Sequence, residues 1–561
     1  MSDFKQEFST WNVRLYHISL LLLLASIPLS KYTTSAAQFL ILALWLFYQS
    51  DLDYIADFNS SGKPLYIRIL RLVSGFLESI LKSLYSKFKS FFHCRAALIL
   101  PSLLVLHVIG LLYTSDFSYA LKDLRTKLPL FLLPLFFSTG PKVNTRTLYW
   151  LYFGYAAAIL AGTIYRIYLF LNLPVADTRE IHSHISHIRF SLNTVYCIFI
   201  LLYFIFLKGF LTRWQKILIA SVVVWFTFFL LYLSYSTGIS ILVIVSILFM
   251  IYKSLIGSDR RKQVIFLATG LVLLAAPLLY FHSVVEQYRH TEPVNYNKLD
   301  RYTTLGNIYR HDTIHFKVEN GKYVGLYICD EELDRMWSKA SRKPLTDLDG
   351  KKQLLKNTLI RYLASKDLRK DSSGVAQLTP KDIGKIEAGL THANNSALFD
   401  IRTPIENLLV SWDNYKYHNN PNSSSLIQRL EYWKASILLL KEHPLIGVGT
   451  GDVPTAFELE YKRMNSLLDP QYRLRAHNQY LSIAVAFGIL GLCWFLFVLV
   501  YPTFAQKGYK DYFYIIFWLI LIISMFTEDT IESQEGVTYF AYFASLLLLA
   551  RDRNETAKAG D

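Results

Sequence analysis

The segment 429–492 brings together an arginine, a glycine-rich loop and a histidine, a combination that can bind an anion and move a proton. Its first part predicts a helix that contains Arg429 and ends at His443, because the α region is disfavoured for a residue before proline. Its second part places His477 and Asn478 immediately before an apolar run that is long enough to cross a bilayer. Arginine binds phosphate oxygens through its planar fork, and histidine can act as a base toward a weakly nucleophilic hydroxyl. We therefore expect a site at the mouth of a membrane helix.

Three glycines separate the predicted helix from the histidine. Gly447, Gly449 and Gly451 form a loop whose backbone lacks side-chain cover, so another group can approach it closely. We expect Gly447 and Gly449 to contact the substrate, together with Asn478.

Basic side chains also stand at the start of two other apolar runs. Arg125 and Lys127 precede one run, and His187 and Arg189 begin another. Helix N-termini carry partial positive charge and free N–H groups, so these residues suit the site of a lipid-linked diphosphate. An ionised side chain at the edge of a span is costly unless it has a partner, which favours a ligand-binding role for Arg189. Arg125 and Lys127 could instead be interfacial residues that extend toward water.

Two clusters contain potential metal ligands. The spacing of His182, His184 and His187 fits no standard zinc site. The loop TEDTIESQEG, residues 527–536, gathers Glu528 with three further carboxylates, which can bind a divalent cation or orient arginines. A site that is lined with arginine does not need a metal to offset diphosphate charge. We therefore expect pairing with arginine, a place for Glu528 in the substrate site, and neither a metal nor a cofactor.

Together these motifs resemble the signature of the O-antigen ligase and polymerase superfamily. The resemblance rests on Arg-x3-Trp, His-Pro-Leu-Ile-Gly-x-Gly-x-Gly and His-Asn-Gln-Tyr-Leu, and extends to GLLYTSDFSYALKDLRTKLPL, HIRFSL and TEDTIESQEG. Members are polytopic glycosyltransferases of the GT-C type that take a glycan from undecaprenyl diphosphate at the periplasmic face of the inner membrane. The resemblance implies that His477 is the general base and that Arg189 and Arg429 hold the carrier diphosphate, with Arg125 as a further candidate. It also implies that catalysis is inverting and independent of metal.

The same resemblance implies transfer of the glycan to lipid A–core. Close relatives instead polymerise O-antigen repeats or glycosylate serines or threonines of proteins, and the motifs do not separate these acceptors. A twelve-span transporter is an alternative of another class. It predicts charged or glycine-broken helices at mid-membrane and an internal repeat, neither of which the sequence indicates. A structural scaffold is the third alternative, and it would not need arginines at the starts of three membrane helices.

The composition indicates an integral membrane protein. Of the 561 residues, 53% are hydrophobic and 15% aromatic, and they are gathered in long runs. The formal net charge of +15 therefore indicates loops that face an anionic cytoplasmic leaflet rather than a nucleic-acid partner. The four cysteines stand far apart and provide neither a disulfide framework nor a zinc-type pair.

Runs of apolar residues predict about twelve membrane helices, with both termini cytoplasmic because the positive charge of the loops then alternates correctly. The runs are 11–29, 33–49, 96–113, 128–138, 148–171, 189–207, 217–234, 239–252, 264–281, 479–501, 512–527 and 537–550. The predicted parts are a membrane domain of nine spans (1–281) with a basic amphipathic cytoplasmic stretch (51–95), a periplasmic domain (282–476), three further spans (477–550) and a cytoplasmic tail (551–561).

Residues 282–476 are the one soluble region large enough for a core of its own. A hairpin is predicted over 313–328 around Asn320-Gly321, and helices over 331–340 and 354–365. Thr379-Pro380 predicts a further helix start. The predicted fold is thus an all-α, GT-C-like polytopic membrane protein with one large α+β periplasmic domain between the ninth and tenth spans.

Overall fold

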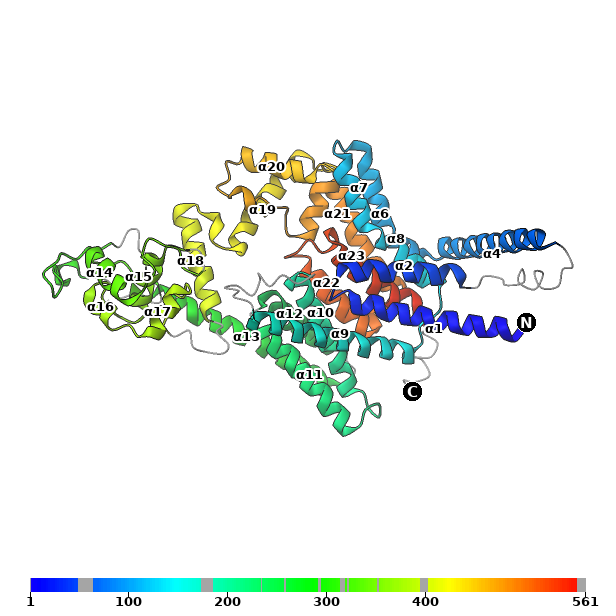
Figure 1. Cartoon of the computed structure of the whole chain (residues 1–561), viewed down its shortest axis with the longest axis horizontal. Coiled ribbons are helices and arrows are strands. Elements are labelled where there is room, and N and C mark those ends of the chain that lie inside the picture. The colour runs from blue at the N-terminus through cyan, green and yellow to red at the C-terminus, as the bar shows by residue number, and fades with distance from the viewer. Residues whose placement is uncertain are drawn as a thin grey trace. The chain divides into compact units, whose positions relative to one another are not determined.

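The computed structural model of the protein is helical along most of the residues that it describes (Figure 1). The chain divides into two compact units. The first comprises Met1–Leu169, His182–Phe249 and Gln428–Asp561, and the second comprises Phe170–Ile181 and Met250–Ile427. The described residues are 2–48, 64–172, 185–233, 235–256, 259–290, 294–312, 318–319, 322–350, 353–393 and 402–551.

The first unit is a helical assembly with an aromatic core. The rings of Tyr152 and Phe513 lie 4.7 Å apart, and those of Tyr196 and Phe543 lie 4.8 Å apart in an edge-to-face arrangement. Its helices are α1 (Ser2–Ser26), α2 (Lys31–Phe47), α4 (Leu65–His93), α5 (Arg95–Ile99), α6 (Ser102–Ile109), η1 (Gly110–Tyr113), α7 (Phe117–Lys127), α8 (Pro129–Thr139), α9 (Thr145–Asn172), α10 (His187–Phe206), α11 (Arg213–Tyr232), α12 (Ser236–Ile256), α19 (Ser425–Glu442), α20 (Val453–Arg463), η5 (Pro470–Tyr472), α21 (Gln479–Ala505), η6 (Gly508–Lys510), α22 (Tyr512–Ser524), η7 (Thr530–Glu532), α23 (Gln534–Ser545) and η8 (Leu546–Ala550). Three of these helices, α9, α12 and α19, extend by a few residues beyond the bounds of the unit.

Seven helices among the described residues are long and apolar enough to cross a membrane, which indicates a multi-pass membrane protein. The other five predicted spans also fall on helices, but α2, α8 and α22 contain only 17, 11 and 13 residues. A straight span needs about 20 residues, so the predicted count of twelve is not confirmed. The seven are Arg95–Tyr113, Thr145–Asn172, His187–Phe206, Arg213–Tyr232, Ser236–Ile256, Arg260–Arg289 and Gln479–Ala505.

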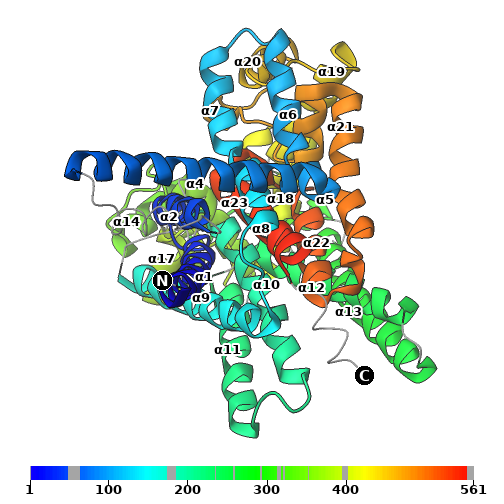
Figure 2. The ribbon, with the colours of Figure 1, turned by 90° about the vertical axis from the view of Figure 1, so that its right-hand side faces the viewer.

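The predicted amphipathic stretch contains the long helix α4. Figure 2 shows α4 lying lengthwise across α2 and α8, against which it packs. The face that it buries is mostly polar, and Lys87 donates from this face to the carbonyl of Trp45 at 2.6 Å, near the end of α2. A cation near a helix C-terminus satisfies carbonyl groups that have no partner within the helix. Large apolar residues such as Leu77 and Tyr85 are exposed instead.

Helix α21 is broken at Gly488, whose φ of 65° and ψ of −166° are open mainly to glycine. The glycine-rich loop 444–451 fills the break. Within this loop, the N–H groups of Val448 and Gly449 donate to the carbonyls of Val485 and Ala486, each at 2.9 Å. These bonds satisfy backbone carbonyls next to the break, as a membrane helix requires. The expectation that no membrane helix is glycine-broken is therefore wrong, because the break is compensated by a loop that is distant in sequence.

The second unit also consists mainly of helices. Buried Trp337, Leu359, Tyr362 and Leu363 form the centre of its core. The hairpin is present as two short antiparallel strands with Val318 opposite Tyr323, whereas residues 313–317 and 320–321 lie outside the described part. The elements are α13 (Arg260–Arg289), η3 (Tyr296–Lys298), β1 (Val318–Glu319), β2 (Lys322–Tyr323), α14 (Asp330–Ala340), α15 (Leu355–Ser365), α16 (Ser372–Ala376), α17 (Pro380–Glu387), α18 (Arg402–His418) and η4 (Pro421–Ser423).

Several local predictions for this unit are confirmed. Helices occur at α14 and α15, and Thr379 and Asp382 form the capping box that opens α17. The described part of this unit is mostly helical and contains two strands of two described residues each, so the predicted α+β class is not confirmed. Residues 428–476, expected in the same domain, lie in the first unit.

Candidate active site at the start of α21

The start of α21 is fixed by the acidic loop 527–533, which precedes α23. Asp529 accepts hydrogen bonds from the backbone N–H groups of His477 (3.1 Å) and Asn478 (3.0 Å) and from the Ser482 hydroxyl (2.7 Å). Asn478 is the N-cap of α21, and its side-chain oxygen accepts from the Leu481 N–H at 3.1 Å. Protein groups thus satisfy N–H groups that a helix start would otherwise leave unpaired. The terminus holds His477 in place and is already occupied by a carboxylate.

His477 adopts a strained backbone conformation beside this carboxylate. Its φ is 45°, in the left-handed region that residues other than glycine rarely occupy. The imidazole stacks on the Tyr432 ring of α19 with a centroid separation of 5.7 Å, and its Nδ1 lies 3.9 Å from Oε2 of Glu528. One third of the side chain is exposed (33%), so the ring is held by protein and still accessible. Strain of this kind persists where the surrounding structure enforces it, often at functional sites.

Two arginines from different elements meet the same acidic loop. Arg429 on α19 donates from Nη2 to Oε1 of Glu528 at 2.9 Å. Arg189, in the first turn of α10, donates from Nη2 to the backbone carbonyl of Asp529 at 2.9 Å. The Nη1 atom of Arg189 is buried and has no hydrogen-bond partner within the described part of the chain. The loop therefore gathers both predicted arginines and the predicted histidine around Glu528 and Asp529.

Glu528 stays ionised at this position. Burial alone would raise the pKa of its carboxyl group, but the interaction with His477 and the charges of Arg189 and Arg429 outweigh burial and lower the pKa. The carboxylate stands between a guanidinium and an imidazole and can orient both. This is the pairing with arginine that the sequence predicts for the loop.

A second ionic cluster lies around the same loop. Lys127 at the end of α7 is fully buried, 2.5 Å from Asp123 and 2.8 Å from Glu532, and Arg475 reaches the same Glu532 oxygen at 3.1 Å. Burial would raise the pKa of Glu532, but the charges of Lys127 and Arg475 lower it far below its ordinary value. Because its ammonium is enclosed and paired with two carboxylates, Lys127 ties α7 to the loop. Direct contact of Lys127 with substrate does not fit this burial.

The glycine loop has a structural task that the sequence does not reveal. A Cβ atom on Gly447 would approach the backbone of Ala486 and Phe487 to 2.4 Å, and the Gly447 φ is 68°. The Gly449 N–H is bound to Ala486, as described above, and the Gly447 N–H donates to His443 at 3.2 Å. Both predicted substrate-binding glycines thus use their N–H groups within the protein and allow the loop to lie close against α21.

The remaining predicted residues do not contact the acidic loop through any bond described above. Arg125 on α7 is exposed, and its guanidinium makes no hydrogen bond or ion pair with a described residue. His187 begins α10, and its ring lies 5.6 Å from that of Tyr235. His182 and His184 lie outside the described residues. Within the described part, no group of three or more His, Cys, Asp or Glu side chains is arranged to hold a metal ion.

Sequence reasoning missed Tyr432 against the histidine, Arg475 and Gln479, and it missed the particular partners of two carboxylates of the predicted acidic loop: Asp529 at the start of α21 and Glu532 at Arg475. Gln479 donates to Glu532 at 3.1 Å and accepts from the N–H of Ile531 at 2.7 Å, which locks the acidic loop to α21. The sequence contains a signal for some of these contacts. Asp529 and Glu532 stand three residues apart, and Arg475 and Gln479 flank His477.

A comparison with known families finds a match for part of this site. Residues 388–496 match the family model described as O-antigen ligase. This segment, here called the ligase domain, is similar to O-antigen ligases. The match confirms the resemblance to the O-antigen ligase and polymerase superfamily and supports an enzyme of glycan transfer. The ligase domain contains Arg429, the glycine loop and His477, whereas Arg189 and the acidic loop lie outside the matched residues. No curated protein matches the chain.

Proposed function

We propose that the protein transfers a glycan from undecaprenyl diphosphate to lipid A–core at the periplasmic face of the inner membrane, as a GT-C-type glycosyltransferase. The observation that carries this proposal is the convergence of Arg429, Arg189 and His477 on one acidic loop. Two of the three belong to the ligase domain. Guanidinium groups beside an accessible imidazole provide what transfer from a diphosphate carrier requires: an anion site next to a base.

In the proposed mechanism the two arginines bind the carrier diphosphate. Arg429 and Arg189 each carry further N–H donors beyond the one used in the protein, so both can bind phosphate oxygens while they remain attached to the loop. Charge grows on the diphosphate as the bond to the sugar breaks. Fixed guanidinium groups in a partly buried site stabilise this charge better than water does. No metal is needed for this step.

His477 accepts the proton of the acceptor hydroxyl in this proposal. Glu528 faces Nδ1 of the imidazole, which favours the tautomer with the proton on Nδ1 and leaves Nε2 as the acceptor. The hydroxyl oxygen then forms a bond to the anomeric carbon on the face opposite the diphosphate. The carbon–oxygen bond to the diphosphate breaks, the hydroxyl proton moves to Nε2, and the configuration at the anomeric carbon inverts.

The choice of acceptor is tested with purified protein and a lipid-linked glycan donor. Lipid A–core, a second donor molecule and a serine- and threonine-containing peptide are offered in parallel, and the products are separated by mass. We expect the glycan on lipid A–core. Product on the second donor would make the protein a polymerase, and product on the peptide would make it a protein glycosyltransferase. Transfer to none of the three would overturn the assignment as a transferase.

A further inference from the structure

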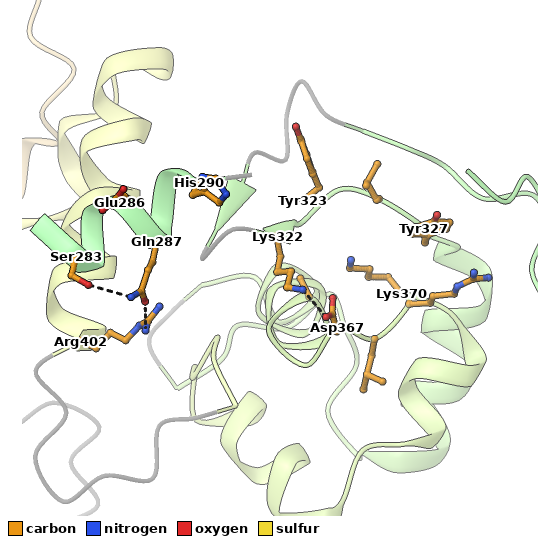
Figure 3. Close-up of a pocket in the computed structure, with 14 residues that line it drawn as sticks. Ser283, Glu286, Gln287, His290, Lys322, Tyr323, Tyr327, Asp367, Lys370 and Arg402 are labelled. Carbon is orange, nitrogen blue, oxygen red and sulfur yellow. Dashed lines mark hydrogen bonds and ion pairs between the residues drawn. The ribbon is translucent and has the colours of Figure 1, made fainter. Parts of the chain in front are cut away.

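The second unit contains a cavity of about 990 Å³ that no part of the proposed mechanism uses (Figure 3). It is bounded by α13, the β2 strand, the residues that follow α15, and the start of α18. Its volume lies at the upper end of the range of roughly 300–1,000 Å³ that is typical of ligand pockets. The wall is built mostly from polar, charged and tyrosine side chains, with Glu286 and Asp367 as its carboxylates, so a purely apolar ligand would not suit it.

Lys370 is the unusual group in this wall. Its side chain is only 5% exposed, and its ammonium group makes no hydrogen bond or ion pair with any described residue. Figure 3 shows the side chain directed toward the ion pair of Lys322 and Asp367. Burial lowers the pKa of Lys370 to about 8, and the charge of Asp367 opposes this shift only in part. A buried cation without a partner is costly, so an anion at this position would be bound favourably.

The other cations of the wall do not need such a ligand. Each of them already has a carboxylate partner, and an added anion would compete with that partner. Among the lysines and arginines of the described wall, Lys370 is therefore the one whose charge is not matched by an ion pair. The paired groups are Lys322 with Asp367 (2.6 Å), Arg402 with Glu406 (2.5 Å) and Arg369 with Asp300.

Backbone strain and aromatic side chains mark the same cavity. Tyr327 and Asp367 both adopt positive φ angles, 58° and 61°, although neither is glycine. Conformations of this kind concentrate at ligand sites. The rings of Tyr323 and Tyr327 can lie against sugar faces, and the amide of Gln287, hydrogen-bonded to Arg402 at 2.9 Å, can contact hydroxyl groups.

We propose that this cavity binds a saccharide that carries an acidic group, a carboxylate or a phosphate, with the acidic group at the Lys370 ammonium. The choice of a saccharide rests on the proposed glycan transfer, whereas the requirement for an anion rests on Lys370 alone. The cavity lies in the second unit and shares no residue with the site at α21. Loss of binding here and loss of transfer there are therefore separable.

Calorimetry on the full-length protein in detergent tests the proposal with three probes: trigalacturonate, glucose 6-phosphate and neutral maltotriose. We expect at least one acidic probe to bind the wild-type protein, and the stronger of the two identifies the acidic group. Lys370→Met should weaken this binding about tenfold or more, because a charge-assisted contact is lost. Lys339→Met, which changes an exposed lysine of the same unit, is the matched control and should leave binding unchanged. Equal binding to the Lys370 variant, equal binding of maltotriose, or no binding of either acidic probe would overturn the proposal.

A labelling experiment on unchanged protein removes the dependence on the folding of a variant. An amine-acetylating reagent is applied with and without trigalacturonate or glucose 6-phosphate, and modification is measured at each lysine by mass spectrometry. The acidic probe that binds should protect Lys370 and leave Lys339 unprotected. Equal modification of Lys370 with and without the probes would contradict the proposal. The Arg429→Ala variant, impaired in transfer, should still bind the acidic probe, which distinguishes failure of this site from failure of the proposed function.

Discussion

At the scale of single residues, the site depends on how two guanidinium groups are held. Arg429 is bound by a side-chain carboxylate and Arg189 by a backbone carbonyl, so each is oriented by the acidic loop and keeps further donors. We expect Arg429→Ala and Arg189→Ala each to lower kcat about 10²–10³-fold, the usual cost of removing a group that stabilises developing charge. Lysine at either position should restore little activity, because it lacks the planar fork.

Transfer rates from a defined lipid-linked donor measure this effect. Arg463→Ala is the matched control, since Arg463 is an exposed arginine of the same ligase domain that pairs with Glu442 at 2.8 Å. It should transfer at the wild-type rate. Full activity of Arg189→Lys and Arg429→Lys would mean that positive charge alone is required and that the bidentate geometry proposed here is incorrect.

The carboxylates of the acidic loop are already used by protein groups. Glu528 accepts from Arg429, Asp529 from the start of α21, and Glu532 from Lys127 and Arg475. We therefore expect transfer to continue at an unchanged rate after EDTA treatment and dialysis into metal-free buffer. A chelator-sensitive rate that Mg²⁺ or Mn²⁺ restores would instead make the acidic loop a cation site.

At the scale of elements, the break in α21 and the glycine loop 444–451 pack against each other and form one structural unit. A Cβ atom at Gly488 would approach the backbone of Leu445 to 2.2 Å, and the residue has a φ of 65°. We expect backbone strain alone to make Gly488→Ala less stable by about 1–3 kcal/mol. The contact of the added Cβ atom with the Leu445 backbone should increase this loss further. The thermal midpoint in detergent measures this loss, and transfer should fall as well because the break and the loop lie next to the start of α21.

Gly384 in α17 provides the comparison. Nothing lies within 4 Å of a Cβ added there, so Gly384→Ala should leave stability unchanged or raise it by about 0.5–1 kcal/mol. If both alanine variants melt alike, the loop does not hold α21 in its broken form.

The helices of the second unit are joined by a buried carboxylate, Glu332. Burial would raise its pKa, but hydrogen bonds from Ser372, Thr303 and Asn307 lower the pKa from 4.5 to about 2. Because the pKa is lower in the folded state, the ionised group stabilises the fold above about pH 4.5, and this contribution is lost as the pH falls toward about 2. At about 1.36 kcal/mol per pH unit, it is worth about 3 kcal/mol.

Thermal or denaturant unfolding of the full-length protein between pH 7 and pH 3 measures this contribution. Glu332→Gln should be less stable at pH 7 and should lose less stability on acidification than the wild type. The exposed neighbour Glu331→Gln is the control and should follow the wild-type curve. An unchanged pH dependence in Glu332→Gln would show that the carboxylate does not contribute as described.

At the scale of the whole molecule, local patterns predicted far more than long-range contacts. The end of α19 before Pro444, the capping box at Thr379 and seven apolar helices long enough to cross a membrane follow from short-range rules, and they are present among the described residues. The bond between Arg189 and Asp529 joins residues 340 positions apart, and no periodicity or motif spacing encodes it. The same holds for the glycine loop. Its composition predicts close approach, but only the three-dimensional structure reveals that the approaching group is the broken helix α21.

The class of the second unit shows a different limit. An alternating sequence around Asn320-Gly321 predicts a hairpin, and paired strands with two described residues each are there. A local hairpin signal does not determine the class of a unit, because the class depends on which elements fill the core. Here Tyr362 and Trp337, both on helices, occupy the core of the unit.

The central claim is that His477 accepts the proton of the acceptor hydroxyl while the arginines hold the donor. Single-turnover transfer and equilibrium binding of an undecaprenyl-diphosphate-linked glycan, both measured on His477→Ala, test it most directly. Removal of a general base costs about 10²–10⁴-fold in rate. We predict a loss of transfer in this range with donor affinity close to that of the wild type, since Arg189 and Arg429 are unchanged. If His477→Ala transfers at near the wild-type rate, His477 is not the base and is only part of the capped start of α21.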